Sequence, residues 1–596
     1  MCGFTGCVSF NKINHENVQK SNEYSICRGP DNTSSLIDTK NINSALWFNR
    51  LSIQDLSDKA NQPMETKDNN YVLMFNGEIY NNSELRNSEE LKNYNFRTSH
   101  SDTETLLAGL KTFGISFITK LEGQFSFFYL DKNCKKIYLA KDRLGQKPLY
   151  YNIDNNTLNF ASDLRSILCL LDKPEISVPN LNEYLSYGVI STPNTIFKNI
   201  NKLEPATYLE INYSNSLLNK KTFKYWDLKS FIDYKKFNQE EFLDIFSSSV
   251  NKRLISDVPI SCFLSGGLDS SSIVKNLYDN NVQANTFSAV VEEEKLNEKK
   301  YIDQVVKKYS TKHIEEKIDS NISTDQIFEA LSCLDEPYGD PSVVPTYIIS
   351  KIISKNFKVA LSGDGGDELL GGYERMKNHL IKRHKINKLF DFAYYIYPGV
   401  FGSGNRLLSK SINLELSYRS NLEDYKFLKN IQKFNTAFSD KLKLDKDLDI
   451  YKAIVLNEYN FYLAEQMLFK IDRASMANSL EVRSPFVDNK LVEYIFSHSS
   501  QYLDNKINKK PLTEYLRSDF DKEFLFRSKQ GFVFDYKNWV FNNKKIIKEI
   551  IYSSILCNFI DLEFFEKLFI YKTRINSLRI WRILVLANYF ERTKVS

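Results

Sequence analysis

The 596-residue chain lacks several features that mark particular classes of protein. Its 79 basic and 74 acidic side chains leave a formal net charge of only +5, which gives no case for a concentrated basic surface. No run approaches the roughly 18 apolar residues of a membrane-spanning helix. The N-terminus carries no signal-peptide pattern. The sequence therefore predicts a cytoplasmic protein with neither nucleic acid nor a membrane among its partners.

Cysteine is also sparse, and its eight residues include no CxxC pair. This spacing argues against a zinc site with locally paired ligands and against a disulfide framework. Cys2 alone has an unusual position. If Met1 is removed, Cys2 carries a free α-amine that can accept the proton of its own thiol. Cys2 is therefore a candidate nucleophile toward a carboxamide or an ester.

The chain divides into two regions with different patterns. Residues 2–212 contain short apolar or alternating runs separated by Gly, Asn and Asp turns, which predicts a β-rich domain. Residues 213–235 are interpreted as a connection. From 236 to 596, short buried strands alternate with longer helical patterns, which is typical of a parallel sheet with right-handed crossovers. The segment near 376–447 is predicted to be a helical insertion.

A cluster of polar residues in the first region fits the binding of an amino-acid amide. The Asn76 amide and the Gly77 N–H can point together at a developing oxyanion, and glycine permits a close approach. Arg50 can clamp a carboxylate bidentately. Glu78 and Asp102 can receive an ammonium group, although Asp102 is equally well placed to cap a helix.

A Ser-Gly-Gly turn between a predicted strand and helix marks a second site. Ser265, Gly266 and Gly267 can turn several backbone N–H groups toward one anion, reinforced by the helix N-terminus. The hydroxyls of Ser270 and Ser271 add further donors. The pattern indicates a phosphate-binding loop that is distinct from GxxxxGK[ST].

A second glycine-rich turn, LSGDGGDELLGGYE, follows the strand-like run FKVAL. It carries Asp364, Asp367 and Glu368, and crowded carboxylates repel unless a cation joins them or one is protonated. Mg²⁺ shared between carboxylates and pyrophosphate oxygens relieves that repulsion. Lys470 can neutralise charge on an α-phosphate, although a lysine beside Asp and Arg is usually a surface ion pair.

The order of motifs carries a family resemblance. MCGFTG, RGPD, NRLSI, FNGEIYN, SDTE and KDRLGQKPLYY resemble those of class II glutamine amidotransferases. SDVPI…FLSGGLDSS, LDEPYGDPS, LSGDGGDELLGGY, KIDRASMANSLEVRSPFVD and KQGF resemble the synthetase domain of glutamine-dependent asparagine synthetases, an N-type ATP pyrophosphatase. The resemblance implies an N-terminal-nucleophile αββα sandwich, followed by a parallel-sheet α/β ATP pyrophosphatase domain with helical additions.

The resemblance also implies roles for individual residues. Cys2 would be the glutaminase nucleophile, and Asn76 with Gly77 would form the oxyanion hole. The glutamine pocket would comprise Arg50, Leu51, Ser52, Ile53, Asn76, Gly77, Glu78 and Asp102. The ATP site would comprise Leu264, Ser265, Gly266, Gly267, Asp269, Ser270, Ser271, Ala289, Ser362 and Gly363. Lys470 would stabilise adenylation, and the carboxylates that engage pyrophosphate through Mg²⁺ would be Asp269 and Asp367.

The implied reaction joins the two halves. Ammonia released from glutamine would pass internally to an acceptor carboxylate that ATP has activated as an acyl-adenylate. Two positions depart from the family pattern. Cys27 stands where the family has a His before RGPD, and we expect this change to alter packing near the site. Asp364 replaces a Glu that takes a proton from the attacking ammonia.

Three functions compete on this sequence. Asparagine synthesis from aspartate is favoured. The alternative is the same chemistry on another carboxylate, such as a uronic acid in polysaccharide assembly. A glutamine-binding scaffold without synthesis is disfavoured by the intact Cys2, Asn76, SGGLDSS and Lys470. The partners are therefore small molecules, and the sequence leaves the oligomeric state open, a homodimer included.

Overall fold

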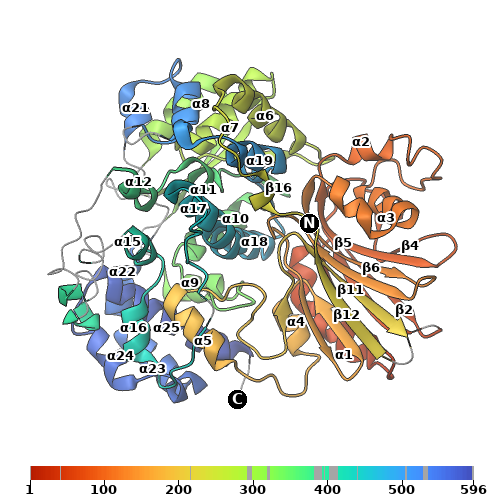
Figure 1. The fold of residues 1–596 in the computed structure, drawn as a ribbon, viewed down its shortest axis with the longest axis horizontal. Helices are drawn as coiled ribbons and strands as arrows, with labels where there is room; N and C mark the ends of the chain where they lie inside the picture. The colour runs from red at the N-terminus through yellow and green to blue at the C-terminus, as the bar shows by residue number, and fades with distance from the viewer. Residues whose placement is uncertain are drawn as a thin grey trace.

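The computed structural model describes residues 2–40, 42–214, 217–291, 298–318, 322–381, 392–394, 396–401, 408, 414–438, 440–503, 507–527 and 534–593. The chain forms a β-rich lobe from its N-terminal third and a largely helical lobe from the remainder (Figure 1). The N-terminal end of the chain lies at the junction between the two lobes.

Two antiparallel sheets form the N-terminal lobe. The first has the strand order β10 (Asn201–Lys202), β8 (Tyr150–Asp154), β9 (Thr157–Ala161), β1 (Gly3–Ser9), β3 (Asn43–Arg50), β2 (Asn32–Asp38). The second has the order β12 (Leu217–Lys224), β11 (Thr207–Ser214), β7 (Lys136–Lys141), β6 (Gly123–Asp131), β5 (Tyr71–Ile79), β4 (Met64–Glu65). Phe4 pairs with Phe48 in the first sheet and Gly77 with Phe125 in the second.

The two sheets pack face to face through apolar side chains from both, and each fully buried phenylalanine contributes about 1.5–3 kcal/mol. The shared core includes Phe4, Val8, Leu46, Phe48, Val72, Met74, Phe128, Leu130, Leu139 and Phe160. The first sheet is contacted by α1 (His15–Asn22) and α4 (Leu164–Leu168), and the second by α3 (Asp102–Phe113). This layering confirms the predicted αββα class.

One predicted boundary differs from the strand pairing. The sequence ends the first domain at residue 212, but β11 and β12 form a hairpin whose register runs from Thr207 opposite Lys224 to Ser214 opposite Leu217. The sheet therefore continues to Lys224. Most residues of β12 are exposed on both faces, so the strand lacks the apolar alternation that would have revealed it.

The C-terminal lobe contains the predicted parallel sheet, which confirms that part of the fold class. Its strand order is β15 (Lys312–Ile318), β14 (Asn285–Val291), β13 (Ile260–Phe263), β16 (Val359–Leu361), β17 (Glu481–Arg483), and every neighbouring pair is parallel. Because β13 and β16 are neighbours, the loops that leave their carboxyl ends emerge side by side. Ligands of open α/β sheets bind at such an edge.

Helices surround this sheet on both sides. They include α6 (Gln239–Lys252), α7 (Leu268–Asp279), α8 (Lys299–Tyr309), α9 (Thr324–Leu331), α10 (Val343–Ile353), α11 (Gly366–Leu370), α17 (Ile450–Asn457), η7 (a π-helix, Glu458–Met467), α18 (Leu468–Met476), α19 (Asn489–Ser497), α20 (Lys510–Leu516) and α21 (Lys522–Phe526). A C-terminal group comprises α22 (Tyr536–Asn542), α23 (Lys544–Ser553), α24 (Leu562–Leu568) and α25 (Arg574–Thr593).

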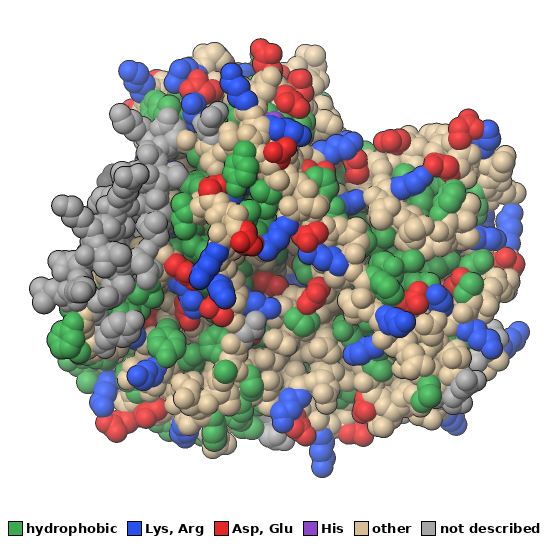
Figure 2. Space-filling model, in the orientation of Figure 1, with side chains coloured by type: hydrophobic (Ala, Val, Ile, Leu, Met, Phe, Trp, Pro, Cys, Tyr) green, Lys and Arg blue, Asp and Glu red, His purple; other side chains and the backbone are tan. Residues whose placement is uncertain are grey.

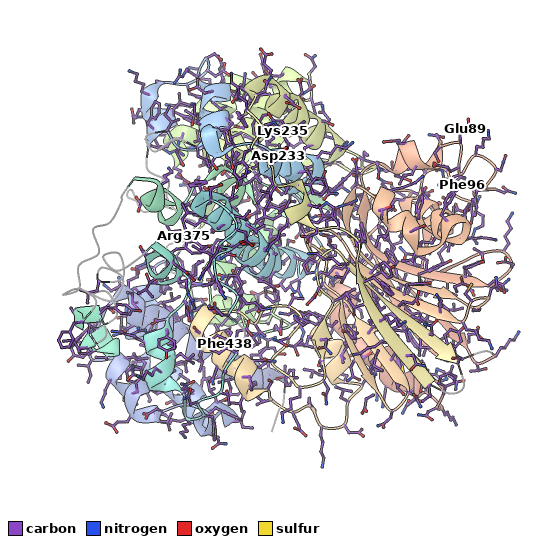
Figure 3. All side chains as sticks on the ribbon, in the orientation of Figure 1. Glu89, Phe96, Asp233, Lys235, Arg375 and Phe438 are labelled. Atoms are coloured by element: carbon purple, nitrogen blue, oxygen red, sulfur yellow. The ribbon has the colours of Figure 1, made fainter. Side chains whose placement is uncertain are left out.

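The predicted insertion lies partly outside the described residues. Its described part is largely helical as far as Ile431, with α12 (Glu374–Ile381), α15 (Leu414–Arg419) and α16 (Tyr425–Ile431), whereas the described residues between 432 and 447 form no helix. α16 contacts α24 and also α5 (Val178–Tyr187). Arg375, labelled in Figure 3, anchors the start of this region through two hydrogen bonds of 2.7 and 2.6 Å to the buried Glu458 carboxylate.

The surface agrees with the near-neutral composition. Figure 2 shows basic and acidic side chains interspersed over the visible face. Within the described residues, no helix combines the length and apolarity needed to cross a membrane.

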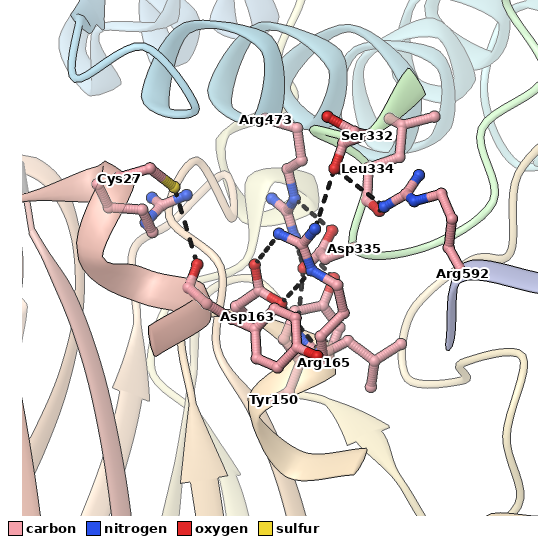
Figure 4. A network of polar contacts seen from close by, with 12 residues as sticks. Cys27, Tyr150, Asp163, Arg165, Ser332, Leu334, Asp335, Arg473 and Arg592 are labelled. Atoms are coloured by element: carbon pink, nitrogen blue, oxygen red, sulfur yellow. Dashed lines mark hydrogen bonds and ion pairs between the residues drawn. The ribbon is translucent and has the colours of Figure 1, made fainter. Parts of the chain in front are cut away.

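A buried network of polar contacts joins the lobes, as Figure 4 shows. Arg473 on α18 donates from Nε to Asp335 Oδ1 at 2.9 Å and from Nη2 to the Tyr150 hydroxyl on β8 at 2.6 Å. The Leu164 N–H donates to Asp335 Oδ2 at 3.3 Å. Burial raises the pKa of Asp335, but Arg473, Arg165 and the Leu164 N–H together outweigh that effect, so the pKa is lowered overall.

We expect Asp335→Ala to destabilise the protein, because it removes the nearest counter-ion of the buried Arg473 guanidinium and leaves only the longer 3.4 Å contact with Asp472. Breaking such a pair costs about 3–5 kcal/mol. Chemical denaturation of the full chain measures this as a lower midpoint. Glu175→Ala is the control, because it removes an exposed pair with Lys198 at 2.8 Å and should leave the midpoint unchanged. Equal midpoints for the two variants would contradict a structural role for the network.

Two candidate active sites

Cys2 lies at the start of β1, beside the lobe junction. Its backbone N–H donates to Asn76 Oδ1 at 3.0 Å, and Arg28 Nε donates to its carbonyl at 3.1 Å. The side chain is 7% exposed. Burial raises the pKa of the thiol, while the Leu51 N–H and the Arg50 charge lower it. A thiol in this setting needs an adjacent base, which the α-amine of a processed Cys2 would supply.

Asn76 has the geometry expected of an oxyanion donor. Its Oδ1 is taken by Cys2, whereas its buried Nδ2 has no hydrogen-bond partner among the residues that the structure describes. A buried donor left unpaired costs about 1–3 kcal/mol, so a ligand atom that accepts from it gains that energy. A Cβ at Gly77 would lie 2.2 Å from the Gln124 carbonyl oxygen, which explains the glycine.

Arg50 is placed differently from the predicted carboxylate clamp. Its Nη1 donates to the Ser57 carbonyl at 2.9 Å and to Asn61 Oδ1 at 2.8 Å, and its Nη2 donates to the Gln54 carbonyl at 3.3 Å. The guanidinium therefore organises the loop from residue 54 to 61 by binding three of its oxygens. Its contact with a substrate carboxylate remains a prediction.

The rest of the predicted pocket segment faces the other lobe. Leu51 and Ile53 are buried in a cluster with Val359 and Met476 of the C-terminal lobe. The Ser52 N–H donates to an Asp31 carboxylate oxygen at 2.7 Å. The RLSI segment thus fixes the lobe interface next to Cys2.

The two predicted ammonium-binding acids lie at the end of β5. Glu78 is buried, and its Oε2 accepts a hydrogen bond of 3.0 Å from Arg483 Nη2 while Gln54 donates to Oε1. Asp102 lies in the first turn of α3, with Ser101 at the N-cap, and accepts from the Ile79 N–H at 3.1 Å. Burial raises the pKa of Asp102 to about 6.

Cys27, which stands where the family has His, also lies at the junction. Its carbonyl accepts a 2.6 Å hydrogen bond from the Ser479 hydroxyl of the C-terminal lobe. Burial raises the pKa of its thiol.

The predicted phosphate loop connects β13 to α7. Gly266 has φ +70°, a value that favours glycine, and Gly267 is the N-cap of α7. The loop is closed by the Ser265 N–H, which donates to Ser270 Oγ at 3.3 Å, and by Ser270 Oγ, which donates to the Gly267 carbonyl at 3.2 Å. The Ser271 hydroxyl is buried and has no hydrogen-bond partner among the described residues, so its contact with a phosphate stays a prediction.

The remaining predicted adenosine residues flank this loop. The Leu264 N–H donates to the Phe287 carbonyl at 2.8 Å, and Ala289 lies further along the same strand, β14. Ser362 directly follows β16. Its Oγ donates to Asp364 Oδ2 at 2.8 Å, and its backbone N–H donates to the Arg483 carbonyl at 3.0 Å.

The two loops are in contact. A Cβ at Gly363 would lie 2.7 Å from Asp269 Cβ, and one at Gly366 would lie 2.4 Å from Asp269 Oδ1. Glycine at both positions therefore lets the β16 loop approach the start of α7. The structure brings Asp269 and the acidic loop together, as the sequence predicts.

The three acids of the β16 loop have three different partners, and that of Asp364 is Ser362. The partner of Asp367 is Lys509, whose Nζ lies 2.6 Å from Asp367 Oδ1 and also pairs with the Asp269 carboxylate at the start of α7. Glu368 accepts from the Tyr373 hydroxyl at 2.7 Å, and burial raises the pKa of Glu368 to about 7. Asp269 and Asp367 thus converge on one positive group.

This donor set fits Mg²⁺. Mg²⁺ is usually bound by one or two protein carboxylates together with substrate phosphates. Within the described part of the chain, no group of three or more His, Cys, Asp or Glu side chains could hold a metal ion. Asp269 and Asp367 would hold the ion.

Lys470 and its two charged neighbours on α18, Asp472 and Arg473, contact different parts of the molecule. Lys470 Nζ donates to Ser342 Oγ at 3.3 Å and is half-buried, so it is no surface ion pair. Asp472 turns to the other lobe and forms two hydrogen bonds, of 2.9 and 3.1 Å, with Arg28. Arg473 is held by Asp335, as described above. Only Lys470 of the three remains a candidate for phosphate contact.

A small cavity of about 20 Å³ lies between the two sites. Its lining comes from both lobes: Gln124, Gln146, Lys147, Ser362, Asp364, Leu468, Ile471, Asp472, Ser475, Val482 and Ser484. Gln124 lies on β6 directly opposite Glu78, at the glutaminase end, and Asp364 lies in the acidic loop. This volume is enough for about one water-sized molecule. Burial lowers the pKa of Lys147 to about 8.

Three residues of these sites carry no local sequence signal. Arg28, Arg483 and Lys509 act on residues far away in the chain, so neither periodicity nor spacing indicates their partners. The KQGF motif lies outside the described residues.

Comparison with known proteins matches both lobes. The family described as asparagine synthase matches residues 241–591, and the glutamine amidotransferase domain matches residues 1–226. Asparagine synthetase [glutamine-hydrolyzing] 1 of Bacillus subtilis is 29% identical over 98% of this chain and 96% of its own length. Putative asparagine synthetase [glutamine-hydrolyzing] 2 of Methanocaldococcus jannaschii is 32% identical over 80% of this chain and 98% of its own.

Among solved structures, a glutamine phosphoribosylpyrophosphate amidotransferase from B. subtilis covers 61% of this chain and 82% of its own, at 11% identity. Its TM-score of 0.29 is too low to support an argument. The match of the asparagine synthase family to more than half of the residues does not depend on it. The chain therefore belongs to the asparagine synthase family and carries a glutamine amidotransferase domain at its N-terminus.

Proposed function

We propose that the protein is a glutamine-dependent asparagine synthetase, a carbon–nitrogen ligase that uses glutamine as its amide-nitrogen donor. The observation that carries the proposal is the placement of two sites on one interface. The Cys2–Asn76 pair lies at the lobe junction, and a small cavity at that junction is lined by Gln124, the strand partner of Glu78, and by Asp364 of the other lobe. Names of relatives from B. subtilis and M. jannaschii support the same activity.

In the glutaminase half, the Cys2 thiolate attacks the glutamine carboxamide after its proton passes to the α-amine. The unpartnered Asn76 Nδ2 and the Gly77 N–H would stabilise the developing oxyanion. Ammonia leaves, and water then resolves the thioester to glutamate. Glu78 and Asp102 would hold the substrate ammonium, and Arg50 the carboxylate.

In the synthetase half, the loop from Ser265 to Gly267 would hold the phosphates of ATP at the positive end of α7. Mg²⁺, when bound, would neutralise charge on the pyrophosphate. Lys509 adds a positive charge between Asp269 and Asp367, where that pyrophosphate would leave. Lys470 remains the proposed residue that stabilises adenylation.

The cavity would carry ammonia from one site to the other. Its lining residues come from both lobes, so it is shielded while the lobes stay together. Asp364 lines its far end and would accept a proton from the attacking ammonia. Its side chain is one methylene shorter than Glu, and Ser362 orients it with a 2.8 Å hydrogen bond. Cytoplasmic location and a homodimer remain predictions from the sequence.

The acceptor is tested with purified full-length protein, glutamine, Mg²⁺-ATP and a panel of carboxylates. We expect pyrophosphate and asparagine to form together when aspartate is supplied. Mass spectrometry identifies the amide. Pyrophosphate release with a uronic acid and none with aspartate would establish the alternative acceptor class. Release with no member of the panel would count against synthesis.

Cys2→Ala should abolish glutamine-dependent amide formation and leave synthesis from added ammonium salt, because the nucleophile serves the first half only. Pyrophosphate release measured with each nitrogen source checks this. Cys7→Ala is the matched control, since Cys7 is buried on the same strand and should retain both activities. Loss of ammonia-dependent synthesis in Cys2→Ala alone would show a different role for Cys2.

Lys509→Met should lower acceptor-dependent pyrophosphate release by about 100-fold or more, because a preorganised positive charge is lost where negative charge develops. Its glutaminase rate should stay within about twofold of the wild type. Lys275→Met is the control, because Lys275 lies on α7 but pairs with Asp519 at 2.7 Å. Unchanged pyrophosphate release in Lys509→Met would remove Lys509 from the site.

A further inference from the structure

The C-terminal lobe contributes a side chain to the glutaminase site. Arg483 ends β17, the edge strand of the parallel sheet, and is fully buried. Its Nη2 crosses the interface to Glu78 Oε2 at 3.0 Å. Its Nε donates to Glu481 Oε1 at 2.6 Å, and its Nη1 donates to the carbonyls of Arg253 at 3.0 Å and Ile255 at 2.6 Å. These contacts fix the guanidinium in one orientation.

Arg483 places a positive charge in direct contact with the buried Glu78 carboxylate. Burial raises the pKa of Glu78 well above its usual value, and nearby Asp102 and Glu481 raise it further, whereas Arg483 opposes that rise. Gln54 also donates to Glu78, but a neutral amide supplies no positive charge. Each carboxylate oxygen of Glu78 has received one donor, and each keeps capacity for a second. A substrate ammonium can therefore join Arg483 and Gln54 on the same carboxylate.

The same residue also touches the synthetase site. The Arg483 carbonyl accepts the Ser362 N–H at 3.0 Å, and Ser362 in turn orients Asp364. The side chain of Arg483 therefore serves one site while its backbone serves the other. Arg483 by itself therefore connects the Glu78 carboxylate with the loop after β16.

We propose that Arg483 is a positioning residue for glutamine binding, which aims the Glu78 carboxylate at the α-ammonium group of the substrate from the opposite lobe. This inference rests on the proposed glutaminase activity. It makes the glutamine site incomplete in the N-terminal lobe alone. Recognition of the ammonium group, rather than of the amide or the carboxylate, is the property that depends on Arg483.

The experiment compares two substrates in the full-length protein: L-glutamine, and glutaramate, which has the same amide and carboxylate without the α-ammonium group. In Arg483→Met we expect KM for glutamine to rise at least tenfold, with kcat changed less. The kcat/KM for glutaramate should change by less than about threefold. Ammonia-dependent pyrophosphate release should persist, since Cys2 and its substrate are bypassed.

Arg253→Met is the matched control. Arg253 is buried beside Arg483 but its Nη1 pairs with Asp488 at 3.0 Å, so its loss should leave the KM for glutamine within threefold of the wild type. Arg483→Lys covers the case in which Arg483→Met does not fold. A lysine Nζ reaches only as far as the Glu481 contact, so this variant should also raise the KM for glutamine, by at least threefold, and spare glutaramate.

The outcomes separate the two proposals. Wild-type protein that releases no ammonia from glutamine would overturn the proposed function itself. Given wild-type glutaminase activity, a KM for glutamine in Arg483→Lys equal to that in Arg253→Met would overturn the role of Arg483. An equal loss of kcat/KM for glutamine and glutaramate would overturn it as well, because the ammonium group would then not be the point of contact.

Discussion

Buried ion pairs across the lobe interface are the constraint on which both sites depend. Arg483 with Glu78, Arg28 with Asp472, and Arg473 with Asp335 each join one lobe to the other or to residues that face it. Replacing such pairs with packed apolar side chains is often neutral or stabilising. Stability alone therefore does not account for them, whereas fixed orientation does, since each fork-shaped guanidinium has one geometry that meets all its acceptors.

The interface also fixes the position of Cys2, the proposed nucleophile. Arg28 holds the Cys2 carbonyl with Nε while its Nη1 and Nη2 bind Asp472 on α18. The backbone of Cys2 is thus tied to the helix that carries Lys470. A displacement of α18 when nucleotide binds would be felt at Cys2 through two hydrogen-bonded contacts. The two chemical steps share a mechanical frame, and the glutaminase site receives the Arg483 side chain from the other lobe.

Local patterns predicted much of this arrangement, and non-local contacts account for what they missed. The Ser-Gly-Gly turn and the Asn76–Gly77 pair are short motifs whose geometry depends on neighbours in the chain, so both lie where the sequence placed them. Lys509 is more than 200 residues from Asp269, and it lies in the left-handed region with φ 45°. No periodicity encodes such a meeting. The contacts of Arg50 with the loop from residue 54 to 61 were not predicted for the same reason, because those loop carbonyls are a folded-state feature, and its contact with a substrate carboxylate stays a prediction.

Ammonia chemistry explains why the interface must stay closed. Ammonia that escapes into neutral water takes up a proton and loses the lone pair with which it attacks an acyl-adenylate. The cavity between Gln124 and Asp364 holds about one water-sized molecule and has walls from both lobes. Its enclosure is therefore a property of lobe contact, not of either domain. Lys147 lines the cavity together with Asp364 and Asp472, and it pairs with Asp472 at 3.9 Å, so the lining carries charges of both signs. Separation of the lobes would open this passage to water, so the buried contacts that position the two sites would also limit the protonation of ammonia.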